Sequence, residues 1–506
     1  MDREAIKMLG AATQTFTEMK SAVFTNLEKA ALKQIVPKVN LYEEVANRIS
    51  LLIDQRVYKT GDRIPSVRAL SRQLKVSIST VMEAYRLMED RGRIEVRPQS
   101  GYYVRLPLPI LSEPETSAPI CEPMSVSSEL VTRVRRDSSN PNLLNLGAAT
   151  PNPELLPLDK LSRTLAAVVR QDNSLGGDYD VPPGCEPLRV QIVRRMLQAG
   201  CTLTPDQIVI TSGCQEAISL SLKAVCRSGD TVAIESPMFY GILQAIESQG
   251  LRALEIPTHP RDGISIEALA NAVARQSVAA CLVISNFSNP LGSCIPDANK
   301  KSLVELLAKH QIPLIEDDIY GELYFGTERP RVAKSFDRSG NVLFCSSFSK
   351  TVAPGYRVGW VAPGKFQTQV EHLKMATNLS TAVPTQMAVA KFLENGGYDH
   401  HLRRIRRIYE RQVAAMTDAI GRYFPPETKV TRPSGGFVIW IELPHRVDSL
   451  ELYQMAVKAG ITIAPGLIFT AQQKYRNCIR LNAAFWSEKV AGAIEVLGKM
   501  AAALKK

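Results

Sequence analysis

A single lysine in the second half of the chain lies among side chains that could hold a phosphate. The apolar run Val342–Cys345 leads to Lys350, and Arg357 follows seven residues after the lysine. Small hydroxyl side chains surround the lysine: Ser347, Ser349 and Thr351. An amine in this setting suits condensation with an aldehyde whose phosphate is bound by the hydroxyls and the guanidinium. We therefore predict that Lys350 carries pyridoxal 5′-phosphate (PLP) as a Schiff base.

Further candidate ligands follow other apolar runs, which predict the strands of an α/β sheet. In open sheets of this kind, ligands bind beyond the carboxyl ends of the strands. Gly213, Cys214 and Gln215 follow the run Ile208–Ile210 and open a helical pattern. The amides at the start of that helix could bind the phosphate.

Aromatic and amide side chains follow the next two runs. Phe239 comes after Thr231–Ile234 and could stack on the pyridine ring, with Tyr240 as the second choice. A core aromatic is the alternative for either ring. Asn289 follows Ala280–Ser285, and its amide could bond the phenolic oxygen of the cofactor.

Three consecutive acids, Glu316 to Asp318, follow the apolar run Pro313–Ile315. A buried carboxylate at Asp317 would keep the pyridine nitrogen protonated and make the ring an electron sink. Tyr320 would join Asn289 at the phenolic oxygen. A run of acids is often a solvated loop, but its place directly after a buried strand favours at least one inward carboxylate.

One arginine, Arg480, lies inside the apolar run Cys478–Asn482. A buried arginine is costly without a partner. A ligand carboxylate bound by both ends of the guanidinium is the partner that we favour, and a protein carboxylate is the alternative.

Together these motifs resemble the class I/II branch of fold-type I PLP enzymes across residues 142–506. The resemblance implies an α/β fold: a mainly parallel sheet with a small C-terminal α+β subdomain. It also implies a homodimer, in which Tyr179 reaches the phosphate across the interface. By matching position, it assigns Lys350 as the catalytic residue and Arg480 to the substrate carboxylate. The remaining cofactor-binding residues are Asp317, Tyr320, Asn289, Phe239, Gly213, Cys214, Gln215, Ser347 and Arg357.

Residues 37–105 predict a different domain, three short helices followed by a hairpin. This pattern is typical of a winged helix-turn-helix. The segment has thirteen basic and eight acidic residues, so its net charge of +5 is nearly half of the +11 of the whole chain. Such a concentration favours double-stranded DNA as the partner. The candidate DNA contacts are Ser77, Ser79 and Thr80 in the major groove, and Arg63, Ser66, Arg68 and Arg97 at phosphates.

This domain resembles the GntR family of bacterial regulators through Thr60–Arg68, Ser79–Tyr85 and Gly101–Val104. One departure is informative, because the family commonly has a base-reading arginine where this chain has Ile78. The operator preference of the family therefore does not transfer. A winged helix that contacts protein is the structural alternative.

The domain order predicts an extension over residues 1–36, to which we assign no function, and a Pro- and Ser-rich linker over 106–141. A GntR-type domain tethered to an aminotransferase-like domain resembles the MocR/GabR branch of transcription regulators. That resemblance implies a DNA-binding regulator that senses an amino compound or PLP by aldimine exchange at Lys350. A working aminotransferase with a DNA-binding domain is the rival interpretation, and a PLP enzyme whose winged helix binds protein is a third.

The composition bears on disulfides, metal binding and membrane spans. The nine cysteines are scattered without a Cys-x-x-Cys pair, and the six histidines lack metal-ligand spacing, so we predict reduced thiols in a cytoplasmic protein and no metal site. No apolar run is long enough to span a bilayer. The basic run His401–Arg407 is interpreted as the solvated face of a helix rather than as a second nucleic-acid site.

Overall fold

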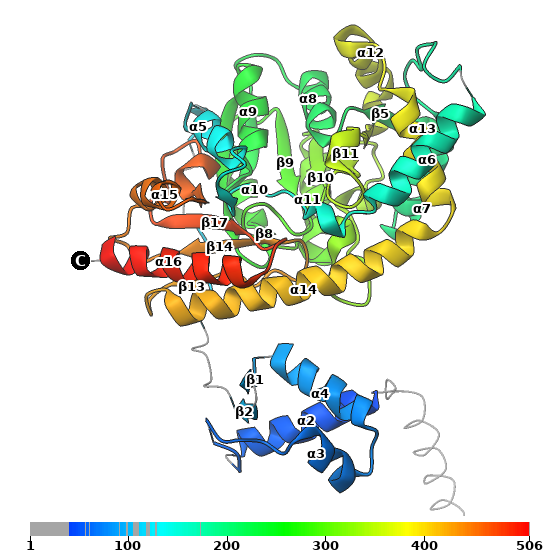
Figure 1. Ribbon diagram of the computed structural model, residues 1–506. Helices are drawn as coiled ribbons and strands as arrows, with labels where there is room; N and C mark the ends of the chain where they lie inside the picture. Colours follow the sequence, from blue (N-terminus) through cyan, green and yellow to red (C-terminus); the bar gives the residue numbers. More distant parts are fainter. Residues whose placement is uncertain are drawn as a thin grey trace, which may run out of the picture. The chain divides into compact units, whose positions relative to one another are not determined.

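The structure, a computed structural model, describes residues 40–55, 57–59, 61–90, 92–97, 100–104, 111–117, 122–126, 129–172 and 174–504. The extension predicted over residues 1–36 lies outside these ranges. The chain forms two compact units, Met1–Pro107 and Leu108–Lys506, which we call the head and the body (Figure 1).

The head contains the predicted three helices and hairpin. Its elements are α2 (Leu41–Asp54), α3 (Val67–Leu74), α4 (Ile78–Asp90), β1 (Ile94–Arg97) and β2 (Gly101–Val104), with β1 and β2 antiparallel. Val81, Ala84, Tyr85 and Met88 recur at helical spacing in α4 and are fully buried. The Tyr85 hydroxyl donates a hydrogen bond to the carbonyl of Pro65 at 2.6 Å, which ties α4 to the start of α3.

The body is built around a mainly parallel sheet with the strand order β3-β7-β6-β9-β10-β11-β12-β5, and β8 pairs with β7. Strands β7, β6, β9, β10 and β11 are parallel, whereas β12 runs antiparallel to both β11 and β5. The bounds are β3 (Met124–Ser125), β5 (Val209–Thr211), β6 (Thr231–Ser236), β7 (Arg252–His259), β8 (Gly263–Ile264), β9 (Ala280–Ile284), β10 (Leu314–Asp317), β11 (Val342–Ser347) and β12 (Gly359–Ala362).

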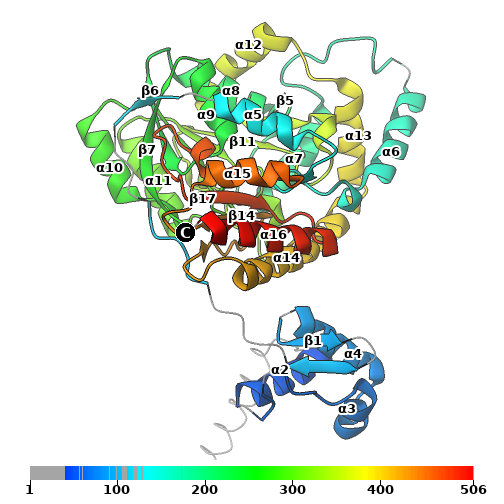
Figure 2. The same ribbon diagram turned by 60° about the vertical axis from the view of Figure 1, so that its left-hand side comes forward.

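Helices cover this sheet on both faces, as Figures 1 and 2 show. The central strands are buried along their whole length, which is why they read as continuous apolar runs. The helices of this part are α6 (Leu158–Gln171), α7 (Glu186–Gln198), α8 (Cys214–Val225), α9 (Tyr240–Ser248), α10 (Ile266–Arg275), α11 (Asp297–Lys309), α12 (Gln367–Asn378) and α13 (Val383–Glu394).

The C-terminal subdomain adds a four-stranded antiparallel sheet of order β13-β14-β17-β16. The long helix α14 (Gly397–Tyr423) passes from the side of the large sheet to this subdomain (Figure 1). The other elements are α15 (Ser449–Lys458), α16 (Glu488–Leu504), β13 (Lys429–Val430), β14 (Val438–Glu442), β16 (Ala464–Pro465) and β17 (Cys478–Asn482), and a separate parallel pair, β4 (Leu144–Asn145) with β15 (Ile461–Thr462).

The segment predicted as an extended linker lies on the body wherever the structure describes it. Leu111 is buried in the core of the C-terminal subdomain, β3 pairs with β7, and α5 (Glu129–Ser138) packs against the same subdomain. Proline-rich backbone is extended, but its carbonyls and hydroxyls remain free to bond to a neighbouring surface. The compact body thus includes most of the segment between residues 106 and 141.

Residues 111–117, which we call the strap, contact both parts of the body. The carbonyls of Leu111 and Ser112 accept hydrogen bonds from Arg432 at 2.8 Å and from the amide of Val430 at 2.9 Å, both in the C-terminal subdomain. At the other end, the Ser117 hydroxyl donates to the carbonyl of Ser236 in β6 at 2.7 Å. The strap therefore bridges the large sheet and the C-terminal subdomain.

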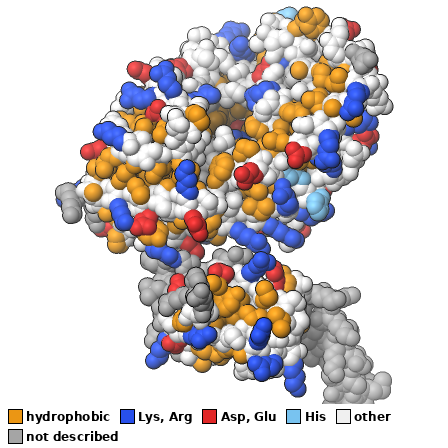
Figure 3. Space-filling view, viewed as in Figure 1, with side chains coloured by type: hydrophobic (Ala, Val, Ile, Leu, Met, Phe, Trp, Pro, Cys, Tyr) orange, Lys and Arg blue, Asp and Glu red, His pale blue; other side chains and the backbone are white. Residues whose placement is uncertain are grey.

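Charged side chains of both signs are interspersed on the face of the body shown in Figure 3. No described helix has the length and apolar character that crossing a membrane requires. Among the described residues, no group of three or more His, Cys, Asp or Glu side chains is arranged to hold a metal ion.

Candidate functional site

The strand register brings the predicted ligands to one edge of the large sheet. Asp317 ends β10 opposite Cys345 of β11. Ser347, at the end of the same strand β11, lies opposite Gly359 of β12, which in turn lies opposite Thr211 at the end of β5. Asp317 lies at one of these strand ends, and the turns after the other two carry Lys350 and Gly213, so the three residues come to the same edge of the sheet.

Lys350 lies half-buried at the centre of this cluster. Its Nζ donates a hydrogen bond to the carbonyl of Ala149 at 2.6 Å and lies 5.6 Å from the ring centre of Tyr320. Burial, and then the nearby Arg480 cation, lower the pKa of Lys350 to about 8. About a tenth of the amine is therefore neutral and nucleophilic at pH 7, and half of it at pH 8.

The loop that carries the lysine is anchored by the start of α14. The Tyr398 hydroxyl donates to Thr351 Oγ1 at 2.9 Å, and His401 Nε2 donates to the carbonyl of Thr351 at 2.7 Å. Burial lowers the pKa of His401 to about 4, so its ring is neutral in this contact. Within the basic run on α14, Arg403 and Arg407 are exposed, as a solvated face requires, whereas His401 belongs to the interior.

Asp317 is buried and points to the same side as the lysine. Its Oδ1 accepts hydrogen bonds from the amide of Ile319 at 3.1 Å and from the thiol of Cys214 at 3.3 Å. Burial raises the pKa of Asp317 to about 7. A positive group next to this carboxylate would favour its ionised form.

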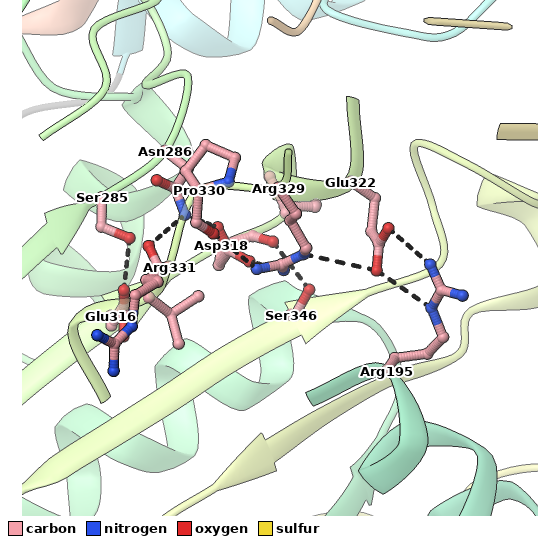
Figure 4. A network of polar contacts seen from close by, with 12 residues as sticks. Arg195, Ser285, Asn286, Glu316, Asp318, Glu322, Arg329, Pro330, Arg331 and Ser346 are labelled. Carbon is pink, nitrogen blue, oxygen red and sulfur yellow. Dashed lines mark hydrogen bonds and ion pairs between the residues drawn. The ribbon is translucent and has the colours of Figure 1, made fainter. Parts of the chain in front are cut away.

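The two neighbouring acids face a separate buried network (Figure 4). Successive side chains of a strand alternate between its faces, so Glu316 and Asp318 point away from Asp317. Asp318 accepts hydrogen bonds from Arg329 at 2.6 Å and from Asn286 at 2.7 Å. These contacts fix the end of β10 and thereby the position of the Asp317 carboxylate.

The turn at Gly213, before α8, forms a cradle beneath Arg357. Gly213 has a φ of +86°, and a β-carbon at this position would lie 2.4 Å from Arg357 Nη2. The arginine donates to the carbonyls of Ser212 at 2.9 Å and Pro354 at 3.3 Å. Backbone amides at the start of α8, together with this guanidinium, suit a phosphate. Only glycine at position 213 leaves room for the guanidinium.

The side chains next to this turn point elsewhere. The Cys214 thiol bonds Asp317, and the Gln215 side chain donates to the carbonyl of Gly241 at 2.7 Å. Only the backbone amides of these two residues could contribute to a phosphate site. Ser347 is buried close to the cradle, and its Oγ accepts the amide of Ser349 at 3.3 Å.

The residues predicted at the cofactor ring also meet here. A side-chain hydrogen bond joins Asn289 to Tyr320, and Asn289 Oδ1 is buried without a hydrogen-bond partner among the described residues. Phe239 lies over Gly241, where a β-carbon would be 2.5 Å from the phenyl ring, and its ring centre is 4.6 Å from that of Tyr240.

Arg480 is fully buried in β17 and lacks partners for much of its guanidinium. Its Nη2 donates to the carbonyl of Gly147, while Nε and Nη1 have no hydrogen-bond partner among the described residues. Its described neighbours are aromatic. Tyr240 and Tyr320 lie close enough to favour its charged form, and the ring centre of Phe469 lies 5.5 Å from its Cζ. Two unsatisfied donors of a buried cation fit a carboxylate ligand.

Several predicted residues are not part of this cluster. Tyr179 is 69% exposed. In the head, Ser66 caps α3 by accepting the amide of Ala69, and Ser77 Oγ accepts the amide of Thr80. The side chain of Arg97 lies outside the described part of the chain.

Sequence reasoning missed three features of the site. Tyr240 lies beside Arg480, whereas the sequence indicates only a stacking ring or a core aromatic at this position. The backbone of Gly147 and Ala149 accepts hydrogen bonds from Arg480 and Lys350. The contact of Cys214 with Asp317 joins residues 103 positions apart, and no local pattern marks it.

Comparison with known proteins agrees with this geometry. Residues 147–497 match the family described as aminotransferase class I and II, and residues 41–104 match bacterial regulatory proteins of the gntR family. The uncharacterized HTH-type transcriptional regulator YjiR of Escherichia coli is 41% identical over 90% of this chain and 98% of its own length. The 2-aminoadipate transaminase of Thermus thermophilus is 29% identical over 74% of this chain and 94% of its own length.

Solved structures match the body. LysN, the α-aminoadipate aminotransferase of Thermus thermophilus, complexed with N-(5′-phosphopyridoxyl)-L-leucine, has a TM-score of 0.69 at 28% identity and covers 75% of this chain and 96% of its own. The kynurenine aminotransferase of Pyrococcus horikoshii has a TM-score of 0.70 at 27% identity, over 75% and 95% of the two chains. The chain belongs to the aminotransferase class I and II family and, through its GntR-type head, to the MocR/GabR branch of transcription regulators.

Proposed function

We propose that this regulator binds PLP at Lys350 and senses an amino acid or a similar amino compound there. The observation that carries the proposal is Arg480, a buried cation with two unsatisfied donors close enough to lower the pKa of Lys350. A carboxylate bound by Arg480 would place the amine of the same molecule beside the lysine. An α-amino acid has this pair of groups.

The residues around Lys350 fit the cofactor. Asp317 would hold the pyridine nitrogen, and Asn289 with Tyr320 would bond the phenolic oxygen. The backbone amides of α8 and Arg357 would bind the phosphate, with Ser347 beside them. Phe239 would stack on the ring. When bound, the cofactor supplies an aldehyde carbon and an electron-withdrawing ring.

The strap offers a route by which ligand binding affects the head. Arg480 belongs to the C-terminal subdomain, whereas Lys350 follows a strand of the large sheet. A ligand that contacts both residues therefore connects the two parts of the body. The strap is hydrogen-bonded to both, and it follows the head in the sequence after residues 105–110. A ligand that favours one arrangement of the two parts would thus also favour one arrangement of the strap.

We further propose that the protein works in the cytoplasm as a homodimer that binds operator DNA with two heads. The exposed aromatic ring of Tyr179 and the 47% exposed Val181 beside it support a second subunit at this loop. In that arrangement Tyr179 would reach the phosphate site of the partner.

Visible absorbance spectroscopy tests the cofactor and its lysine. The reconstituted protein should absorb in the visible range, borohydride should fix the cofactor to Lys350, and Lys350→Ala should abolish both signals. Addition of amino acids should change the spectrum, whereas the corresponding amines without a carboxylate should need far higher concentrations. A colourless protein after reconstitution would exclude the sensor and the enzyme alike.

A variant at Arg480 separates carboxylate recognition from cofactor binding. Arg480→Lys keeps the charge but loses the fork geometry, so we expect about 100-fold weaker binding of amino acids with little change for simple amines. Equal losses for both ligand classes would contradict the assigned role.

Catalytic turnover is the second candidate function, because Lys350, Asp317 and Arg480 together provide proton transfer and carboxylate recognition. Incubation with paired amino and keto acids distinguishes the two. Sustained product formation would indicate an aminotransferase, whereas a spectral change without product would indicate a sensor. Failure to retain promoter DNA at any salt concentration would instead favour a head that binds protein.

A further inference from the structure

The exposed face of α4 carries two large apolar side chains. Ile78 is 50% exposed and Met82 is 52% exposed. They are four residues apart, so they lie on the same side of the first two turns of the helix. In helix-turn-helix domains, the N-terminal residues of the second helix of the motif are the ones that reach base edges.

The hydroxyl groups at the start of α4 are largely used within the helix. Ser77 Oγ accepts the amide of Thr80 at 3.0 Å and also contacts Ser79 Oγ at 2.8 Å and Thr80 Oγ1 at 2.7 Å. Ser77 therefore acts as the N-cap of α4. These contacts compete with any bond from the same hydroxyls to a base.

The first two turns of α4 lack the side chains that usually read purines. Residues 78–83 are Ile, Ser, Thr, Val, Met and Glu. Arginine and lysine recognise guanine, and asparagine and glutamine recognise adenine, but none of these four residue types occurs there. The apolar feature of the major groove is the 5-methyl group of thymine, and Ile78 and Met82 match it chemically.

Basic side chains around this face favour DNA as its partner. Arg63, Arg68 and Arg72 are exposed on the turn before α3 and on α3 itself. Arg63 also lies against the hairpin turn, where a β-carbon on Gly101 would be 3.2 Å from its Nε. Such a surface would bind phosphates around an apolar reading face.

We propose that Ile78 and Met82 read thymine methyl groups in the major groove of the operator. The proposal rests on the DNA-binding function of the head and specifies which base feature it recognises. It predicts a preference for A·T pairs at the positions that α4 contacts. Phosphate contacts supply affinity there but carry no sequence information.

Deoxyuridine substitution tests the proposal. Duplexes are first selected from a random library with the full-length protein, and the selected sequence is then synthesised with deoxyuridine in place of thymidine, one position at a time. This change removes a single methyl group and keeps base pairing. At contacted positions we expect about a fourfold loss of affinity per methyl group.

Variants connect the loss to the two side chains. Ile78→Ala and Met82→Ala should each bind the thymine and uracil duplexes with nearly equal affinity at one contacted position. Leu51→Ala is the matched control, because Leu51 is 54% exposed but belongs to α2 rather than to the reading helix. It should discriminate thymine from uracil as the unsubstituted protein does.

Other outcomes would overturn the inference. Equal affinity for thymine and uracil duplexes at every position, with salt-dependent binding retained, would refute methyl recognition but leave DNA binding intact. A change in self-association of the Ile78 and Met82 variants, with DNA affinity unaffected, would make this face a protein contact. Absence of DNA binding even at low salt would refute the function of the head itself.

Discussion

The thiol of Cys214, the first residue of α8, donates a hydrogen bond to Oδ1 of Asp317, the last residue of β10. Both side chains are buried, and their separation is 3.3 Å. The contact links the turn that would hold the phosphate to the carboxylate that would hold the pyridine nitrogen. Cys214 thus positions Asp317 in addition to any role of its amide.

Removing this thiol should weaken cofactor binding. Burial raises the pKa of Asp317 to about 7, and the Cys214 hydrogen bond opposes that rise. In Cys214→Ala the pKa should move higher, so less of the carboxylate is ionised at pH 7. Because a hydrogen bond to a charged group is worth about 1.5 kcal/mol, we expect roughly a tenfold weaker affinity for PLP at pH 7 and a smaller loss at pH 9.

Equilibrium titrations followed by absorbance measure this effect. Cys214→Ser retains a donor of similar size and is the control, since its affinity should stay within a few fold of the unsubstituted protein. If the affinity for PLP depends on pH in the same way in Cys214→Ala and in the unsubstituted protein, the contact has no effect on Asp317.

The rate of cofactor attachment should follow the titration of Lys350. Burial lowers its pKa to about 8, and only the neutral amine is nucleophilic. Stopped-flow absorbance should therefore show a rate that rises about tenfold per pH unit below pH 8 and levels off above it. A rate that keeps rising toward pH 10 would indicate an ordinary lysine.

The same shift predicts a stability effect in the protein without PLP. The folded state binds fewer protons than the unfolded state between pH 8 and the usual lysine value of 10.5. Stability from this group therefore increases as the pH rises through that window. Lys350→Met should remove this slope in urea unfolding measured from pH 8 to 10.5.

The strands of the body could be predicted where they are buried on both faces. The run Cys478–Asn482 coincides with β17, and Val342–Cys345 lies within β11. Strand β7 was missed because Glu255 and Pro257 interrupt its apolar pattern. Glu255 is nevertheless fully buried, since Thr470 and the amide of Ala471 donate to it from the C-terminal subdomain. Such distant partners leave no local signal.

The candidate site was predictable at the level of strand ends but not of side-chain direction. The rule that ligands lie beyond parallel strands located Lys350, Asp317 and Gly213, and the structure brings them together. The direction of the Cys214 thiol depends on its neighbour across the sheet, which sequence does not reveal. The strap was likewise hidden, because its bonds to Ser236 and Arg432 depend on the folded body.

The carboxylate of Glu322, whose side chain is 16% exposed, should be essential for the stability of the body. It contacts Arg195 at 3.0 Å, Arg406 at 3.3 Å and Arg329 at 3.7 Å, and Figure 4 shows it with the first and the last of these. Glu322→Gln would leave these guanidiniums without their shared anion, so we expect a loss of about 3–5 kcal/mol in the free energy of unfolding.

Urea unfolding followed by tryptophan fluorescence measures this loss, because all three tryptophans of the chain lie in the body. Glu495→Gln is the control, since Glu495 pairs with Lys499 on the exposed face of α16 and should cost less than about 1 kcal/mol. A Glu322→Gln protein as stable as this control would show that the arginines find other partners.

Burial disfavours the charged form of Glu322, but the guanidiniums of Arg329 and Arg195 lower its pKa below the usual value. Its contribution to stability is therefore present above the usual glutamate pKa and is lost as the pH falls through the folded-state pKa. Acid unfolding of the body should accordingly lose part of its steepness in Glu322→Gln. An unchanged acid transition would place the titrating groups elsewhere.

Coupling between the ligand site and the head should depend on Ser117. Its hydroxyl donates to the carbonyl of Ser236 at 2.7 Å and accepts the amide of Thr258 at 3.2 Å. It also bonds the hydroxyl of Tyr475, which belongs to the C-terminal subdomain. Ser117→Ala removes these bonds at the point where both parts of the body meet the strap. Because one hydrogen bond contributes about 1 kcal/mol, we expect the ligand-dependent change in operator affinity to fall about fivefold.

The measurement compares operator affinity with and without a saturating amino acid in the unsubstituted, Ser117→Ala and Ser112→Ala proteins. Ser112 is the matched control, because it bonds the body through its backbone carbonyl and its side chain is exposed. Spectral titrations should be the same for all three proteins, since Ser117 belongs to the strap rather than to the ligand site. If Ser117→Ala retains the full change in operator affinity, the strap does not carry the coupling, and another connection between body and head must do so.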